Sequence, residues 1–156
     1  MTSIRHSRPR AVALAVLVAA AVTLLQGATA RGSQTLVVTS VLDDGTGSLR
    51  QAVRDAAAGD TITFADSLRG QMIVITTGEI AMTRDLTVAG PGANQLTIHA
   101  AGSSRIFSIA AGATVSISGV TLTGAQASDG KGGAIRNEGT LSLADAAIVS
   151  LSLIHI

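Results

Sequence analysis

Two adjacent carboxylates are the first side chains in this sequence that could bind a ligand. Asp43 and Asp44 are the only neighbouring acidic residues, and they lie in the turn sequence Asp-Asp-Gly-Thr-Gly. Carboxylate oxygens are preferred ligands of calcium, so this turn is a candidate calcium site. A helix is expected directly after the turn, and negative charge is also favourable near a helix N-terminus. Under this second interpretation the two carboxylates need no metal.

A glycine-rich segment around Lys131 has elements of two ligand-binding motifs and satisfies neither. The spacing from Gly124 to Lys131 misses that of a P-loop by one residue, and no Ser or Thr follows the lysine. The calcium-binding nonapeptide repeat requires an Asp at a fixed place after its glycines, which Asn137 does not supply. His99 is the only histidine between positions 31 and 150, so it lacks a second imidazole. We therefore expect no cofactor and assign no cofactor-binding residue.

Acid–base catalysis on a polysaccharide would need carboxylates gathered in one place. The charged residues that could line one face of the fold are Arg84, Asp85, Arg105, Arg136 and Glu138. Nothing in their spacing forces them together in one pocket. Phe64 and Phe107 lie in apolar segments, which favours core packing over ligand stacking. We assign no catalytic residue and expect no enzymatic activity.

The composition excludes several classes of site. The chain has no Cys, so it has neither a disulfide scaffold nor a thiolate metal site. It has no Trp or Tyr, which removes the aromatic platforms typical of single-strand-binding surfaces. Three of its 11 basic residues, Arg5, Arg8 and Arg10, lie near the N-terminus, leaving 8 against 10 acidic residues. The remainder is slightly acidic, so we expect no nucleic-acid partner.

Residues 1–30 have the pattern of a secretory signal peptide. The basic start precedes an apolar run, Ala11–Leu25, which only Thr23 interrupts, and Ala28-Thr29-Ala30 is an A-x-A cleavage signal. We expect cleavage between Ala30 and Arg31, by the general secretory route because no twin-arginine pair is present. The run is shorter than the roughly 20 residues that span a bilayer, although an uncleaved anchor is the alternative. The mature protein is expected to be secreted or held at the cell surface, without a membrane span.

The elements that would position any site are short strands. Between Asp85 and Ser150, apolar and small polar residues alternate as in strands with one buried face. The alternating segments are Leu86–Val88, Leu96–Ile98, Ile106–Ile109, Val115–Ile117, Val120–Leu122 and Leu141–Leu143. Glycine-rich turns separate them, and the segments starting at Thr114 and Thr140 are similar at an offset of 26 residues. The pattern predicts an all-β solenoid whose coils bury their apolar faces against one another.

A cap is predicted before the solenoid, over residues 31–60. It begins with a strand, Leu36–Val41, which is rich in β-branched residues. Ser48 and Gln51 form a capping box, and a Leu/Val/Ala stripe predicts an amphipathic helix, Leu49–Ala58, that Gly59 ends. A solenoid's first coil exposes an apolar end to water, so we expect this helix to cover it, with the coils occupying 61–150.

The last six residues, 151–156, break the repeat where the next turn is due. Leu-Ser-Leu-Ile-His-Ile is the translation of CTG TCT CTT ATA CAC ATC, which resembles a transposon-end adapter used in sequencing libraries. We interpret 151–156 as adapter-derived and expect the natural protein to continue beyond Ser150. The alternative is a genuine short C-terminal strand.

Several motifs resemble those of the CSLREA family of bacterial exported proteins. Gly47-Ser48-Leu49-Arg50-Gln51-Ala52-Val53 resembles the signature, and Gly59-Asp60-Thr61-Ile62-Thr63-Phe64 is similar to the segment that follows it. Arg105-Ile106-Phe107 also matches, and Gly132-Gly133-Ala134-Ile135-Arg136-Asn137 is similar to the repeat of polymorphic outer-membrane proteins. The resemblance covers nearly all of residues 35–150. It implies a right-handed parallel β-helix on a secreted or surface-displayed protein, and no defined catalytic residues.

The chain departs from that family at two positions, and two functions remain open. Gly47 stands where the signature has Cys, and Leu151 where the repeat continues with Asn. We expect a non-enzymatic structural or adhesive β-helix whose partner is a surface ligand, either a polysaccharide or the surface of a host or neighbouring cell. The alternative is the N-terminal part of a polysaccharide lyase or hydrolase of pectate-lyase-like architecture. The lack of aromatics and of clustered carboxylates favours the first.

Overall fold

The computed structural model of the chain describes residues 31–101, 104–127, 133–149 and 152–153. The fold described below belongs to the unit Ser33–Ile156. The predicted signal peptide, residues 1–30, lies outside the described residues, as do Leu151 and 154–156 of the predicted adapter segment. Within the described ranges, no helix is both long and apolar enough to span a bilayer.

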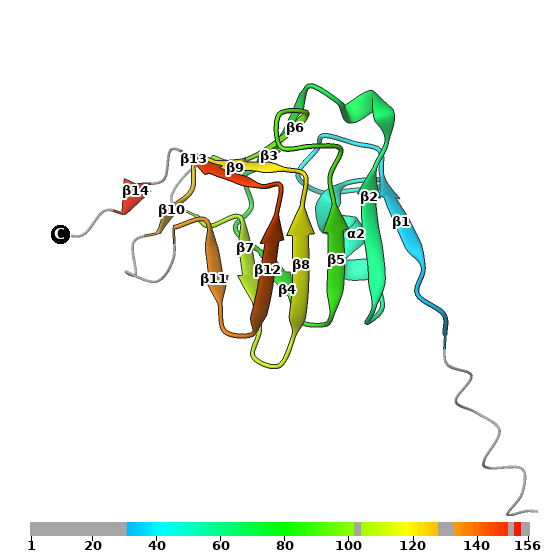
Figure 1. Cartoon of the computed structure of the whole chain (residues 1–156). Helices are drawn as coiled ribbons and strands as arrows, with labels where there is room; N and C mark the ends of the chain where they lie inside the picture. Colours follow the sequence, from blue (N-terminus) through cyan, green and yellow to red (C-terminus); the bar gives the residue numbers. More distant parts are fainter. Residues whose placement is uncertain (1–30, 102–103, 128–132, 150–151, 154–156) are drawn as a thin grey trace, which may run out of the picture. The chain divides into compact units, whose positions relative to one another are not determined.

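The unit Ser33–Ile156 is mostly β-structure, as the alternation predicted (Figure 1). Its described residues include one short α-helix, α2 (Leu49–Asp55), and one 3₁₀ turn, η2 (Asp66–Leu68). The strands are β1 (Thr35–Val38), β2 (Asp60–Phe64), β3 (Gln71–Ile75), β4 (Ile80–Met82), β5 (Leu86–Ala89), β6 (Leu96–Ala100), β7 (Phe107–Ile109), β8 (Thr114–Ser118), β9 (Thr121–Thr123), β10 (Gln126–Ala127), β11 (Ile135–Asn137), β12 (Thr140–Ala144), β13 (Ala147–Val149) and β14 (Ser152–Leu153).

The chain winds through parallel sheets as a β-solenoid, which confirms that prediction. One sheet has the order β1-β2-β5-β8-β12, a second β13-β9-β6-β3, and a third β11-β7-β4, while β10 pairs with β14. Every strand pairing among the described residues is parallel. The turns of the solenoid are β2–β4, β5–β7, β8–β11 and β12–β14. Each turn places its strands directly over those of the turn before.

The core consists of aliphatic ladders that run from turn to turn. In the five-stranded sheet Ile62, Val88 and Ile117 lie in register and are fully buried. The alternate positions point outward and carry small hydroxyl residues such as Thr87 and Ser116. Burying a Val or Ile side chain contributes about 1.5–3 kcal/mol to folding, so the ladder is the main stabilising element. Phe107 is also fully buried, as its apolar segment predicted.

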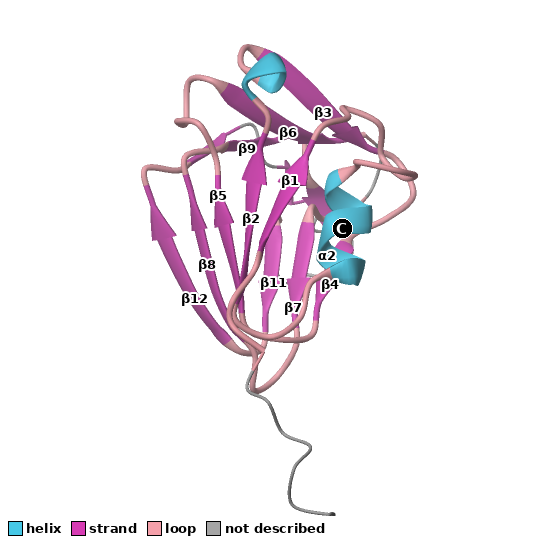
Figure 2. Ribbon diagram, turned by 90° about the vertical axis from the view of Figure 1, so that its right-hand side faces the viewer, coloured by secondary structure: helices cyan, strands magenta, loops and turns pink. Residues whose placement is uncertain are grey.

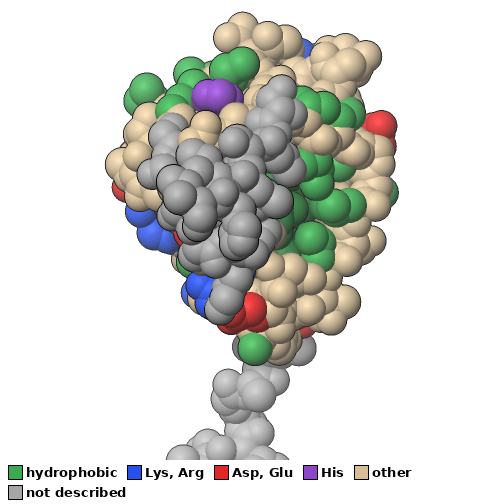
Figure 3. Space-filling view, turned by 90° about the vertical axis from the view of Figure 1, so that its left-hand side faces the viewer, with side chains coloured by type: hydrophobic (Ala, Val, Ile, Leu, Met, Phe, Trp, Pro, Cys, Tyr) green, Lys and Arg blue, Asp and Glu red, His purple; other side chains and the backbone are tan. Residues whose placement is uncertain are grey.

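The predicted repeat is confirmed by the register of its two copies. Thr140 pairs with Thr114, and the pairing continues to Ala144 with Ser118. The same interior positions change environment between these turns, because Ile117 is fully buried while Leu143, its partner in register, is 41% exposed. Ile148 is likewise 40% exposed although its partner Leu122 is fully buried. Figure 3 shows hydrophobic side chains gathered on the face at this end of the stack.

Helix α2 starts as predicted and ends three residues early. Its N-cap, Ser48, accepts a hydrogen bond from the amide of Gln51 at 3.1 Å, but the Gln51 side chain bonds Asp55 and does not reach back. The predicted end was Ala58, and the helix ends at Asp55. The cause is a competing acceptor: the carboxylate of Asp60 takes the amide of Ala57 at 2.8 Å, and the backbone is already extended at Ala56.

The first strand is also shorter than predicted. The prediction was Leu36–Val41, and β1 starts one residue earlier, at Thr35, and ends at Val38. It ends there because the next two amides, of Thr39 and Ser40, donate to the carbonyl of Gly47. The segment 39–47 is therefore a closed loop between β1 and α2. Helix α2 contacts β1 and β4, which are strands of two different sheets (Figure 2). It buries Leu49, Ala52 and Val53.

Candidate functional site

The carboxylate of Asp43 is the most heavily hydrogen-bonded side chain among the described candidates. One oxygen, Oδ1, accepts from Nε and Nη2 of Arg50 at 3.1 and 2.8 Å. The other, Oδ2, accepts from the amide and hydroxyl of Thr76, both at 2.9 Å, and from the amide and hydroxyl of Thr77 at 2.7 and 2.8 Å. Thr76 and Thr77 lie in the turn between β3 and β4. The loop 39–47 is thereby tied to a segment more than thirty positions away.

The electrostatics of Asp43 are dominated by these donors. Partial burial raises the pKa of Asp43, but the hydrogen bonds from Arg50, Thr76 and Thr77 outweigh it and hold the pKa far below its ordinary value. The side chains of Asp43 and Arg50 are only 11% and 12% exposed. The pair is therefore well shielded from water, and its hydrogen bonds are of the stronger, charge-assisted kind.

Arg50 extends the network from the helix to the backbone of the same turn. Its Nη2 donates to the carbonyl of Gly78 at 2.6 Å and its Nη1 to the carbonyl of Glu79 at 3.1 Å. A guanidinium carries five N–H donors in a fixed plane, so one side chain can hold a carboxylate and two carbonyls together. Arg50 thus connects α2, the loop 39–47 and the β3–β4 turn.

Asp44 lies beside Asp43 and has a different, exposed partner. Its carboxylate pairs with Arg54, and both side chains are about half exposed. The hydrogen bonds from Arg54 and from the Gly45 amide lower the pKa of Asp44. Exposed ion pairs of this kind contribute little to stability.

The geometry around these carboxylates favours a structural role over calcium binding. Asp43 faces a cationic guanidinium and a set of N–H and O–H donors, and calcium would need oxygen acceptors in their place. Asp44 turns to a separate arginine, so the two carboxylates do not share a ligand. Across the described residues, no group of three or more His, Asp or Glu side chains is placed to hold a metal ion.

Two small pockets lie beside helix α2. One, of about 200 Å³, is lined by Arg50, Val53, Arg54, Glu79, Ile80 and Ala81. The other, of about 250 Å³, is lined by Leu36, Val37, Gly47, Ser48, Gln51, Ala52 and Asp55. Each contains a single carboxylate, whereas glycoside hydrolysis ordinarily requires two. Neither pocket therefore has the pair of carboxylates typical of a glycoside hydrolase among the residues that line it.

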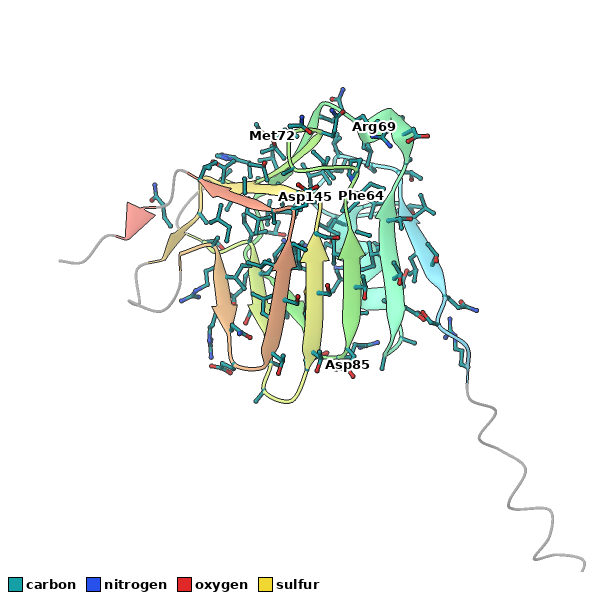
Figure 4. All side chains as sticks on the ribbon, viewed as in Figure 1. Phe64, Arg69, Met72, Asp85 and Asp145 are labelled. Atoms are coloured by element: carbon teal, nitrogen blue, oxygen red, sulfur yellow. The ribbon has the colours of Figure 1, made fainter. Side chains whose placement is uncertain are left out.

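The remaining charged candidates are used in separate pairings. Asp85, at the start of β5, accepts the amide of Thr114 at 2.7 Å, and Figure 4 shows it at the end of the sheet opposite Phe64. Arg84 donates to the carbonyl of Ala56, just beyond α2. Arg105 pairs with Glu79 at 3.1 Å.

Arg136 pairs with Glu138, and the hydrogen bond that the guanidinium donates to that carboxylate raises the pKa of Arg136. These contacts tie successive turns or neighbouring residues together. His99 lies in β6, in register with Thr123 of β9, and its ring sits where a side chain at Gly124 would have to go. The structure thus brings Arg105, Arg136 and Glu138 near one another around Glu79, because Arg136 is within electrostatic reach of both Glu79 and Arg105. Arg84 and Asp85 have other partners.

Gly47, the position where the CSLREA signature has Cys, is constrained in this chain. Its φ of +77° lies in the left-handed region, which residues with a Cβ rarely adopt. A Cβ there would also meet the hydroxyl of Thr39. The loop that carries Asp43 closes at this residue, because the Gly47 carbonyl accepts the amides of Thr39 and Ser40 at 2.9 and 3.0 Å. The departure from the signature is therefore matched to the conformation of the loop.

The partners of Asp43 in the β3–β4 turn were not among the sequence candidates. Thr76 and Thr77 are two hydroxyl residues in an ordinary turn, and no motif pairs them with a distant carboxylate.

No family model, curated protein or solved structure matches this chain.

Proposed function

We propose that this chain is a non-enzymatic structural or adhesive β-helix that works outside the cell or at its surface. The observation that carries the proposal is the use made of the charged side chains. Asp43, Arg50, Asp85 and Arg105 all hold neighbouring segments of the solenoid together. A stack of parallel strands braced in this way is a rigid scaffold, and its outer face is the part available to a ligand.

The proposed location, outside the cell or at its surface, rests on residues 1–30 and on the resemblance to exported bacterial proteins. Residues 1–30 have the tripartite pattern of a signal peptide, and the motifs at 47–53 and 132–137 are similar to those of exported bacterial proteins. We infer from the same resemblance that the solenoid is right-handed. The ligand class that fits is a polysaccharide or the surface of another cell, which the protein would contact without transforming it.

Helix α2 is proposed as the cap of the first turn. It contacts β1 and β4 and places Leu49, Ala52 and Val53 in the buried core. An uncapped solenoid end would expose apolar ladder positions, as Leu143 and Ile148 do at the other end of the described stack.

The proposal is tested by expressing the full chain in an exporting bacterium. We expect N-terminal sequencing of the exported protein to begin at Arg31, and recovery of intact Met1 in the membrane fraction would contradict export. The purified protein is then mixed with whole cells and with a panel of bacterial and plant polysaccharides. We expect it to sediment with a surface and to leave the polymers intact. Release of reducing ends or of unsaturated sugars would establish an enzyme and overturn the structural function.

A further inference from the structure

The loop 39–47 connects β1 to α2, and one carboxylate in the loop accepts hydrogen bonds from two other segments of the chain. Asp43 lies between two partners that belong to different parts of the fold. On one side is Arg50, in the first turn of α2. On the other is the pair Thr76 and Thr77, after the end of β3. The loop 39–47, which we call the strap, is therefore held near its middle by hydrogen bonds to two other segments.

These hydrogen bonds to two segments are made by Asp43 and not by the adjacent Asp44. Asp43 accepts six hydrogen bonds within 3.1 Å and is 11% exposed. Asp44 makes an ion pair with Arg54, one helical turn after Arg50, and both members are half exposed. Two carboxylate–arginine pairs thus join the same loop to the same helix. Only the Asp43–Arg50 pair also reaches the solenoid.

Other polar contacts to the first turn follow directly after the end of α2. Arg84, which precedes β5, donates to the carbonyl of Ala56. Asp60 of β2 accepts the amide of Ala57 at 2.8 Å and that of Gln34 at 2.8 Å. These contacts hold the chain as it leaves the helix. The start of the helix depends on Asp43 and Arg50 for its polar connection to the β3–β4 turn.

We propose that Asp43 and Arg50 form a latch that couples helix α2 to the β3–β4 turn, so that the two open only together. With the latch closed, the strap holds Leu49 and Val53 against the core. When the latch is broken, the start of α2 moves away from the core while its end stays bonded to the first turn. The apolar face that α2 covers then becomes accessible to water. The latch is a conformational device of the cap. It rests on the proposed cap role of α2, and it goes beyond that role by assigning the control of opening to two residues.

Hydrogen exchange followed by mass spectrometry measures the coupling on the full chain. In the wild type we expect peptides covering 39–55 and 76–80 to exchange at a common rate under native conditions. In Asp43→Asn and in Arg50→Lys we expect faster exchange in 39–55 than in 76–80, with β5 to β9 still protected. Arg50→Lys keeps the charge but loses the planar fork of donors, so it separates the bond geometry from the charge.

The matched control is Asp44→Asn, which removes the exposed pair from the same loop. We expect its exchange pattern to follow the wild type. A fluorescent probe of apolar surface, anilinonaphthalene sulfonate, should bind Asp43→Asn and Arg50→Lys more strongly than Asp44→Asn, with the β-type circular dichroism unchanged. If Arg50→Lys lost its fold, Thr77→Val would replace it, because that change removes one hydroxyl donor and leaves the helix untouched.

The proposal is overturned if the latch variants exchange like the wild type, or if Asp44→Asn opens the same segment. It is also overturned if all peptides accelerate equally, because the two residues would then stabilise the whole fold without controlling one part. Failure of the cap role itself has a different signature: 39–55 would exchange freely in the wild type.

Discussion

The carboxylate of Asp43 and the guanidinium of Arg50 meet through two hydrogen bonds, at 2.8 and 3.1 Å, where both side chains are almost wholly shielded from water. Seven positions separate them in the chain, and the helix N-cap Ser48 lies between them. The pair joins the turn before α2 to the first residues of the helix. From there Arg50 reaches the carbonyls of Gly78 and Glu79.

Breaking this pair should cost more stability than breaking its exposed neighbour. Hydrogen bonds to charged groups contribute about 1.5–3 kcal/mol, and removing one partner leaves the other charge shielded and unpaired. We expect Arg50→Ala to lower the free energy of unfolding by about 2–4 kcal/mol, measured by denaturant titration. Arg54→Ala is the matched control and should leave the midpoint nearly unchanged. Equal losses in the two variants would show that burial of the pair has no energetic effect.

The same pair should make stability depend on pH in the acid range. The pKa of Asp43 is lower in the folded chain than in the unfolded one, so its contribution is fully present above the unfolded value of about 3.9. It is lost as the pH falls from there toward the folded pKa. We expect the melting temperature of Asp43→Asn to change less between about pH 2 and pH 6 than that of the wild type.

The side chains of Asp43 and Asp44 should not require calcium. Their oxygens already accept hydrogen bonds from Arg50, Arg54 and the β3–β4 turn. We expect the melting temperature of the full chain to be the same in millimolar calcium and in EDTA. A rise with calcium that Asp43→Asn abolishes would restore the calcium interpretation.

Truncation of two adjacent residues of β8 should have very different effects on stability, because one side chain faces the core and the other faces outward. Ile117 is fully buried between Val88 and Leu143, so Ile117→Ala should destabilise by about 2–5 kcal/mol. Ser116 faces outward in register with Thr87 and Ser142, so Ser116→Ala should change stability by less than about 0.5 kcal/mol. Urea unfolding monitored by circular dichroism compares them directly. Similar losses would mean that the strand is not in this register.

Placing at position 47 the Cys of the CSLREA signature, which this segment resembles, should destabilise this chain. Gly47 has a positive φ, and an L-residue in that region costs about 1–2 kcal/mol. We expect Gly47→Ala and Gly47→Cys to lower stability by about this amount under reducing conditions. Gly32→Ala is a suitable control, since a Cβ there meets nothing within 4 Å. A neutral Gly47→Cys would indicate that the loop can relax into another conformation.

The alternation of side chains was enough to predict strands such as β8 and β12 and the side of each that faces inward. Val115 and Ile117 flank Ser116, and the same order recurs at Leu141, Ser142 and Leu143. A period of two can be satisfied only by an extended chain with one apolar side, and an offset of 26 residues aligns the two copies. The start of the helix was equally local, because Ser48 caps it through the amide of Gln51.

The end of the helix and the fastening of the loop were decided by tertiary structure. Ala57 leaves the helix because the carboxylate of Asp60 competes for its amide, and Asp60 is held in place by the next strand. Asp43 finds Thr76 and Thr77 only after β2 and β3 have folded back and brought that turn beside it. Local periodicity encodes which side of a strand is buried. Partners separated by thirty residues depend on how the turns stack, and nothing in their own neighbourhoods marks them.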